Sequence, residues 1–432
     1  MLVGGDVFFQ RNTAQTLTTA GGATNIYGET IVANTAGLTI NSGNGNVTLH
    51  GLLNSGNQYA FVSTADNATW TNARTAARNG TAGGSAIGDS YLVTITSRLE
   101  NSIAGLTARY QSAWIGAYRD RNNSLGGGNT LWYWADGPEA GQHFFTQSDG
   151  STVAGYYSNF DSGEPNGTGT GGEGFGQFVG GEGLWNDLPN TGSNNSTFTI
   201  KGYVRETNLA PSPVTINAGA GGLEISGGVG TSKPLASLIV TSSATTINGN
   251  GAVTTGEQDY SSSLTVNSAG STEQVKISVG SGKEISAGGD IEIFGDKIDL
   301  GADLNTSTAN GNILLQAPTL IDALGAERTL NAGSGDITLT TDKVESGNNT
   351  PNWLVIDTTG TFTLEPSSNA WPSSFVVGSF FNFDGAVSSG NFEGSSGVPE
   401  SAWLQINSIA SLGGLTLGRV GSTGGIAIDS PI

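Results

Sequence analysis

Short segments in which apolar and polar residues alternate recur along most of the chain, each after an apolar residue, an Asn or Ser and a Gly-rich turn. The copies are Ile40–Gly43 before Val47–Leu49, Ile216–Gly219 before Leu223–Ile225, Ile247–Gly249, Val266–Ser268, Ile285–Gly288 before Ile291–Ile293, and Leu330–Gly333 before Ile337–Leu339. From Ile247 onward the copies are roughly 19–25 residues apart, the length of one coil of a parallel β-solenoid. Val, Ile and Leu would point inward, and Gly and Asn would take the corners where a positive φ is needed. The pattern predicts a mainly β chain built on a right-handed parallel β-helix.

The repeat is absent between about residues 52 and 208, and the composition changes there. Five of the eight tryptophans lie in this stretch. It also holds the two helix-like segments, Asn67–Arg78 with Asn67 or Thr69 as the N-cap, and Arg98–Ala108 with Ser97 as the N-cap. We therefore expect an α+β domain inserted at a corner of the solenoid, which is physically easy when the termini of the inserted domain lie close together.

The predicted domains are residues 1–51 for the first solenoid coils, 52–208 for the inserted domain and 209–432 for the continuing solenoid. Each coil of a solenoid buries its apolar face only against its neighbours. The strand at Val47–Leu49 must therefore stack on the strand at Leu223–Ile225, across the whole insertion.

The amino-acid composition excludes several classes of function. The chain has 432 residues, no cysteine, 68 glycines and a net charge of −20. So few cations argue against nucleic acid and anionic membrane surfaces as partners, and the lack of Cys excludes disulfides, thiolate metal sites and cysteine nucleophiles. No apolar run approaches the roughly 18 residues of a membrane span. The abundance of Gly, Ser, Thr and Asn is typical of β-rich extracellular proteins.

The two ends of the sequence carry no targeting signal. Met1–Asp6 has neither a basic region nor an apolar stretch, and Ser430–Ile432 follows directly on a strand-like segment. We therefore expect the sequence to be a piece of a longer protein.

An ordered series of aromatic and polar phrases runs through the inserted stretch. In chain order they are Thr69–Ala73, Tyr91–Ser97 with Glu100 and Asn101, Trp114–Ala117, Leu131–Gly137, Gly163–Asn166, Glu173, Leu184–Asp187 and Tyr203–Glu206. Their order and spacing resemble the C-type lectin domain over about residues 56–207. The resemblance implies a lectin-like fold that binds sugars through calcium.

Five side chains in this stretch offer carboxylate or amide oxygens, the hard ligands that Ca²⁺ takes in sets of about six to eight. They are Glu164, Asn166, Glu173, Asn186 and Asp187. Two neighbouring sugar hydroxyls can complete such a shell while donating to carboxylates and accepting from Asn amides. An isolated copy of Glu164–Asn166 would be an ordinary surface turn. Together with the other three oxygen donors it predicts a calcium site.

The resemblance adds finer expectations. The peptide bond before Pro165 is cis in C-type lectins, and the order Glu-Pro-Asn accompanies mannose, glucosamine and fucose-type ligands, whereas Gln-Pro-Asp accompanies galactose. Mannose-type specificity is thus implied. Gly167 and Gly174 stand where the family has the acidic residues of a second calcium site, so we expect one calcium ion. The family's cysteine positions fall at or near Ala77, Phe175 and Arg205, so apolar packing must replace disulfides.

Several other residues have a structural interpretation that we favour over a functional one. We expect Trp114, Trp132, Trp134 and Trp185 to build a core rather than to stack on sugar, and Asp290, Glu292, Asp296 and Asp299 to form a solvated outer face rather than a catalytic carboxylate cluster. Gly280–Lys283 lacks the rest of a phosphate-binding loop and predicts a turn. His50 and His143 are isolated, which gives a zinc site or a histidine-based triad little support.

The flanking repeats resemble those of filamentous-haemagglutinin-like bacterial adhesins, most visibly in Gly414–Arg419 and Gly424–Ile428. We therefore predict a secreted, surface-exposed bacterial adhesin fragment: a β-helix stalk whose inserted C-type lectin-like domain binds cell-surface or matrix glycans through Ca²⁺, without catalysis. Two alternatives remain. One is a calcium-independent protein-binding module on the same stalk, and the other is a β-helical polysaccharide-degrading enzyme.

Overall fold

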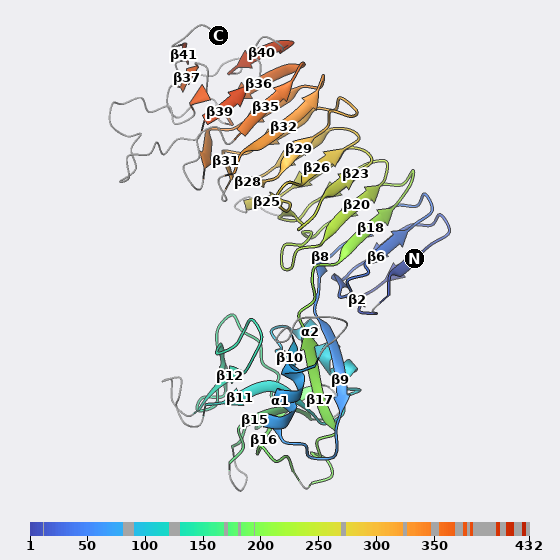
Figure 1. Cartoon of the computed structure of the whole chain (residues 1–432), viewed down its shortest axis with the longest axis vertical. Coiled ribbons are helices and arrows are strands. Elements are labelled where there is room, and N and C mark those ends of the chain that lie inside the picture. The colour runs from blue at the N-terminus through green and yellow to red at the C-terminus, as the bar shows by residue number, and fades with distance from the viewer. Residues whose placement is uncertain are drawn as a thin grey trace. The chain divides into compact units, whose positions relative to one another are not determined.

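In a computed structural model, the chain forms two compact units. The residues described are 1–11, 13–80, 90–120, 130–167, 172–179, 183–193, 195–268, 274–322, 326–346, 354–367, 375–377, 381–382, 403–406, 412–418 and 426–428. The first compact unit, called the solenoid unit, is formed by 1–56 together with 210–432, and the second, called the insert unit, is formed by 57–209. Figure 1 shows the strands of the solenoid unit stacked in successive coils. The sequence pattern placed residues 52–56 in the insert, but they belong to the solenoid unit, where Leu53–Ser55 pairs with Thr30–Val32.

The solenoid unit is built from parallel sheets that run along successive coils. The first sheet contains, in order, β1 (Leu2–Val3), β4 (Thr24–Ile26), β7 (Val47–Leu49), β19 (Leu223–Ile225), β21 (Thr245–Ile247), β24 (Leu264–Asn267), β27 (Ile291–Phe294), β30 (Ile313–Gln316), β33 (Ile337–Thr340), β36 (Thr361–Glu365) and β40 (Gly414–Leu417). Every pair of neighbours is parallel. The predicted mainly β solenoid is thereby confirmed.

Two further faces complete each coil. The second sheet contains β3 (Gln15–Thr18), β6 (Leu38–Asn41), β18 (Pro213–Asn217), β20 (Ser237–Thr241), β23 (Gln258–Tyr260), β26 (Glu284–Ala287), β29 (Asp303–Asn305), β32 (Arg328–Gly333), β35 (Leu354–Thr358), β39 (Trp403–Ile406), β38 (Phe381–Asn382), β37 (Phe375–Val377) and β41 (Ile426–Ile428). The third face has β2 (Val7–Phe9), β5 (Thr30–Val32) and β8 (Leu53–Ser55), then β22 (Gly251–Val253), β25 (Gln274–Ser278), β28 (Lys297–Gly301), β31 (Thr319–Asp322) and β34 (Lys343–Ser346). In the second sheet β38 runs antiparallel to both of its neighbours.

The strands before and after the insertion lie side by side in register. Val47 pairs with Leu223 and Leu49 with Ile225, and β6 pairs with β18. The inward residues of these strands are almost completely buried and belong to one continuous apolar core. Burying each such side chain contributes about 1.5–3 kcal/mol. The predicted stacking across the insertion is confirmed.

Polar side chains at one corner join successive coils by bonding the backbone of the next coil. The Oδ1 of Asp290 accepts from the amide of Asn312, Asn312 Oδ1 accepts from Asp336, and Asp336 Oδ1 accepts from Thr361, at 2.7–2.8 Å. The turn glycines take a positive φ, as at Gly43 (59°) and Gly333 (62°). The Asn and Asp of the repeat therefore satisfy turn amides that have no strand partner.

The expected solvated face of carboxylates is correct only in part. Asp296 is exposed and Asp290 bonds the next coil, but Asp299 is only 6 % exposed. It lies on β28 between Lys276 and Ile321 in the strand register, so strands on both sides cover it. The predicted turn at Gly280–Lys283 is confirmed by the hydrogen bond from the Lys283 amide to the Gly280 carbonyl.

The insert unit is an α+β structure with one branched sheet. The sheet contains β9 (Gln58–Ser63), β10 (Ser90–Leu92), β17 (Gly202–Thr207), β11 (Ala113–Arg119), β12 (Leu131–Trp134), β13 (His143–Thr146), β14 (Ser151–Thr152), β15 (Phe175–Val179) and β16 (Leu184–Leu188). Its first and last strands, β9 and β17, pair antiparallel from Gln58 with Thr207 to Ser63 with Gly202. The two ends of the insert unit therefore lie together.

Both predicted helices of the insert unit are present. Helix α1 (Trp70–Arg78) begins after Thr69, whose hydroxyl accepts from the amide of Asn72. Helix α2 (Arg98–Thr107) begins after Ser97, whose hydroxyl accepts from the amide of Glu100. Such N-caps each contribute about 1 kcal/mol. Among the described residues, no helix is long and apolar enough to cross a membrane.

Candidate calcium and sugar site

The strand β16 anchors the candidate site. Trp185 is completely buried in this strand and packs its ring edge-on against Phe160 at 5.5 Å and Trp134 at 5.9 Å. The amide of Asp161 donates to the Trp185 carbonyl, and the amide of Glu164 donates to the Asp161 carbonyl, both at 2.9 Å. These bonds attach the segment that carries Glu164 to the strand that carries Asp187.

Three of the five predicted ligands are brought together by hydrogen bonds. The backbone amide of Asn166 donates to Glu164 Oε2 at 3.0 Å and to Asp187 Oδ1 at 3.1 Å. The side-chain Nδ2 of Asn166 donates to Glu164 Oε1 at 2.9 Å, and the amide of Gly167 donates to Asp187 Oδ2 at 3.1 Å. The peptide bond before Pro165 is cis, as predicted. One backbone amide thus lies between two carboxylates.

Burial raises the pKa values of both carboxyl groups. Burial, followed by a hydrogen bond and charge repulsion from Asp187, raises the pKa of Glu164 to about 7. Burial is also the largest influence on the pKa of Asp187 and raises it. Hydrogen bonds with the Asn166 amide, the Glu164 side chain and the Gly167 amide, and the nearby Arg119 guanidinium, act in the opposite direction and lower it. A bound cation would stabilise the ionised form of two close carboxylates that are partly removed from water.

Of the other two predicted ligands, Asn186 is next to Asp187 on β16 and Glu173 precedes β15. Asn186 is 5 % exposed, and its Nδ2 donates to the Asp187 carbonyl at 3.0 Å. Glu173 is half-buried just before β15, and its carbonyl accepts from Arg119 Nη2. Because β15 pairs with β16, with Gly176 opposite Asp187, Glu173 lies near the same end of this hairpin.

Two further polar residues border the site, and the sequence pattern did not identify them. Arg119, near the end of β11, donates through Nη1 to Gln147 Oε1 at 2.6 Å, and Gln147 also accepts from Trp132 Nε1 at 3.4 Å. A Cβ at Gly167 would lie 2.7 Å from Arg119 Nη1 and 2.9 Å from Gln147 Nε2. Both side chains therefore lie against Gly167, whose amide donates to Asp187. The sequence does contain a signal that could have identified Arg119. Basic residues are rare in this chain, with only 16 in all, and Arg119 closely follows the Trp114–Ala117 phrase.

The donor set agrees with calcium in its chemistry. Glu164, Glu173 and Asp187 supply carboxylates and Asn166 and Asn186 supply amides, all of them hard oxygen donors. Within the described ranges, no group of three or more Asp, Glu or His side chains is close enough to hold a metal ion by itself. A calcium ion here would depend on the amide oxygens as well as the carboxylates.

The tryptophans of the insert unit form its core, as predicted. Trp114, Trp132, Trp134 and Trp185 are each at most 1 % exposed. The indole nitrogen of Trp114 donates to the Ala68 carbonyl, and that of Trp185 donates to Asn101 Oδ1. Each bond satisfies a polar atom that burial would otherwise leave unpaired.

A second buried carboxylate, separate from the five predicted calcium ligands, lies on β17. Glu206 is 1 % exposed and accepts from the Thr94 amide at 3.0 Å and from Asn57 Nδ2 at 2.5 Å. Burial, followed by repulsion from Glu100 and Glu139, raises the pKa of Glu206 to about 8, against these hydrogen bonds, which lower it. The pKa values of the nearby Tyr59 and Tyr91 hydroxyls are raised as well, mainly by burial and then by repulsion from Glu206.

This carboxylate makes the stability of the insert unit depend on pH. Because the pKa of Glu206 is about 8 in the folded protein and 4.5 is its ordinary value, the folded state binds more protons between these values. Stability is therefore highest at low pH and falls as the pH rises through this window. Glu206→Gln should remove the loss, so its free-energy gain over the parent should grow on the order of a few kcal/mol between pH 5 and pH 8.5.

Denaturant unfolding followed by tryptophan fluorescence at several pH values measures this gain. Glu224→Gln, on the outer face of the solenoid unit, is the matched control and should show no growing difference. A free-energy difference between Glu206→Gln and the parent that stays constant with pH would contradict the buried-carboxylate interpretation.

Two solved structures of carbohydrate-recognition domains are similar to part of this chain. The cow C-type carbohydrate-recognition domain of CD23, solved in the presence of a GlcNAc2Man3 oligosaccharide, is 22% identical over 36% of this chain and 88% of that chain, with a TM-score of 0.23. The carbohydrate-recognition domain of mouse scavenger receptor C-type lectin is 22% identical over 35% of this chain and 92% of that chain, with a TM-score of 0.22. No protein-family model matches the chain, and no curated protein does.

Proposed function

We propose that the insert unit binds mannose-type sugars through one calcium ion held by Glu164, Asn166, Glu173, Asn186 and Asp187. The observation that carries the proposal is the Asn166 amide, which bonds both the Glu164 and the Asp187 carboxylates. This arrangement brings the buried Asp187 and the half-buried Glu164 together beside the exposed Asn166. The charge is left for a cation to balance.

Calcium at this position would supply a Lewis-acidic centre for a pair of neighbouring sugar hydroxyls. The protein's own groups would then select the sugar. Carboxylate oxygens of Glu164 accept hydrogen bonds from hydroxyls, and the amide of Asn166 donates to them. A pair of equatorial hydroxyls can satisfy both kinds of partner at once.

We further propose that the chain is part of a secreted bacterial surface adhesin in which the solenoid unit is a stalk, with a binding rather than a catalytic role. The polar outward residues of the coils and their Gly and Asn corners support a stalk. The partners would be cell-surface or matrix glycans.

A glycan array probed with the chain in calcium and again in EDTA tests the proposal. We expect mannose-type ligands to be bound in calcium and lost in EDTA, and calorimetry to give one calcium per chain, since Gly167 and Gly174 leave no carboxylates for a second ion. Binding of a protein partner that persists in EDTA would instead support the protein-binding alternative. Turnover of a polysaccharide would support the enzyme.

Specificity should follow the order of donor and acceptor at the ion. The double substitution Glu164→Gln with Asn166→Asp keeps the summed charge, and it keeps a side-chain hydrogen bond between the two positions while reversing its donor. Array preference should move from mannose-type toward galactose-type ligands. The same exchange at Glu224→Gln with Asn248→Asp, a bonded Glu and Asn pair in the solenoid unit, is the matched control. An unchanged array profile in the site variant would mean that other residues choose the sugar.

A further inference from the structure

A cavity of about 490 Å³ adjoins the proposed calcium site, and Glu164 and Pro165 form part of its wall. The rest of the wall comes from β13, from β14, from the turn between these two strands and from the segment that leads to Glu164. Its volume is within the range of small-molecule sites. A sugar residue bound at Glu164 would therefore have its neighbouring residue beside or inside this space.

The wall combines polar groups with an aromatic floor. Gln147, Thr152, Ser158 and Asp161 supply amide, hydroxyl and carboxylate groups, and Phe160 supplies an apolar surface. A pyranose has the same division, with hydroxyls around its edge and C–H groups on its faces. Among the described residues that line the cavity, Asp161 and Glu164 are carboxylates and none is a cation, which favours a neutral sugar over an acidic one.

The wall is held in place before any ligand binds. Phe160 packs edge-on against Trp132 at 5.1 Å and against Trp185 at 5.5 Å. The Thr152 and Ser158 hydroxyls bond each other at 2.5 Å, and Gln147 is fixed by Arg119. Little side-chain freedom would be lost on binding, so contacts made here would add directly to affinity.

We propose that this cavity is a second sugar subsite, which takes the neutral hexose next to the calcium-bound residue of an oligosaccharide. The proposal rests on the proposed function and extends it from a terminal monosaccharide to a chain of at least two neutral sugars. Thr152 and Ser158 would bond the hydroxyls of the second sugar, and Asp161 would accept from one of them.

The test compares two ligands on the full chain in calcium, methyl α-mannoside and an α-linked mannobiose, by calorimetry. The parent should bind the mannobiose about tenfold more tightly than the monosaccharide. Thr152→Tyr, at an exposed strand position that faces the cavity, should fill the space and abolish the difference, with monosaccharide affinity changed by less than about twofold. Ser151→Tyr, the neighbour on the same strand that does not line the cavity, is the matched control and should keep the parental ratio.

Two results would overturn the subsite while leaving calcium-dependent sugar binding intact. One is equal affinity of the parent for the two ligands, and the other is a parental ratio in Thr152→Tyr. A parent that binds neither ligand in calcium would instead contradict the proposed function itself, and the subsite with it.

Discussion

Asp187→Asn should lower calcium affinity by at least about 100-fold and abolish calcium-dependent sugar binding while the insert unit stays folded. Asp187 is completely buried and its two carboxylate oxygens accept from the amides of Asn166 and Gly167. The substitution keeps the side-chain volume and one oxygen acceptor, so the loop retains part of its attachment to β16. It removes the full negative charge that faces Glu164. Calorimetry of calcium binding and a glycan array in calcium measure the two effects.

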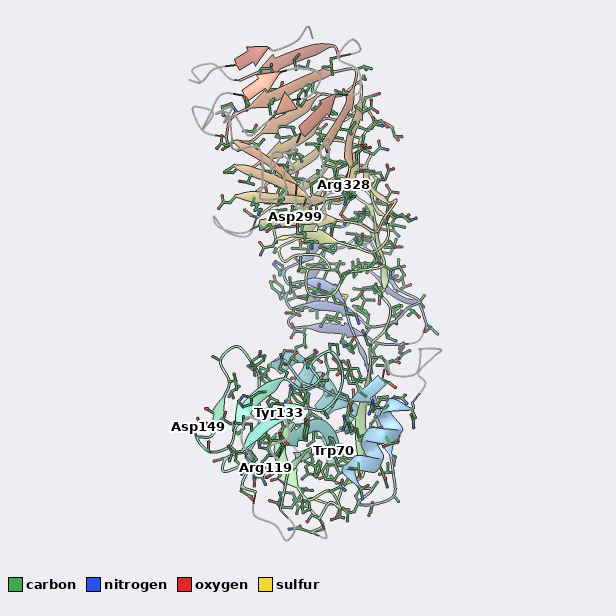
Figure 2. All side chains as sticks on the ribbon, turned by 60° about the vertical axis from the view of Figure 1, so that its left-hand side comes forward. Trp70, Arg119, Tyr133, Asp149, Asp299 and Arg328 are labelled. Atoms are coloured by element: carbon green, nitrogen blue, oxygen red, sulfur yellow. The ribbon has the colours of Figure 1, made fainter. Side chains whose placement is uncertain are left out.

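Asp149→Asn is the control for this experiment. Asp149 is exposed and lies at the periphery of the insert unit, where it accepts from the Ser151 amide and hydroxyl (Figure 2). The same charge is removed from the same unit, so calcium and sugar binding should be unchanged. Asp187→Asn with parental calcium affinity would exclude the proposed site, and a loss in both variants would point to a general effect of charge.

The sequence predicted the solenoid well because its coils obey a local rule. An inward residue such as Val47 can be buried only by its counterpart in the next coil, so the repeat determines which strands are neighbours even across the insertion. The position of Asp299 was not predicted, because alternation along one strand says nothing about how closely the flanking strands cover an outward side chain.

The sequence identifies the proposed ligands only where they form contiguous phrases. Glu164 and Asn166 share one turn, and Asp187 belongs to a tryptophan-containing strand, so their types could be recognised. Arg119 is the last residue of β11 and Gln147 directly follows β13, so the two meet only because of the sheet order. The cavity wall likewise joins Thr152 with Ser158 through a hydrogen bond, and neither residue belongs to a recognisable pattern.

Replacing residues 57–209 with a short Gly/Ser linker should leave a cooperatively folded solenoid that no longer responds to calcium. The chain leaves and re-enters the solenoid unit at adjacent points, because the Ser212 amide donates to Ser55 Oγ at 2.8 Å and the Ser212 hydroxyl donates to the Val32 carbonyl at 2.8 Å. A short linker can therefore join 56 to 210 without disturbing the pairing of β6 with β18 or of β7 with β19. Circular dichroism and calorimetry should show β structure and one thermal transition.

Two substitutions in the linker variant test whether the thermal transition comes from the unfolding of stacked coils. Val47→Asp places a charge in the core, where Val47 is completely buried, and should cost several kcal/mol and abolish the cooperative transition. Thr48→Asp, on the same strand but facing outward, should leave it nearly unchanged. The excised 57–209 should fold alone, because β9 and β17 pair with each other and the tryptophan core is its own. A linker variant that aggregates, together with an unfolded excised unit, would mean that the two units cannot fold independently.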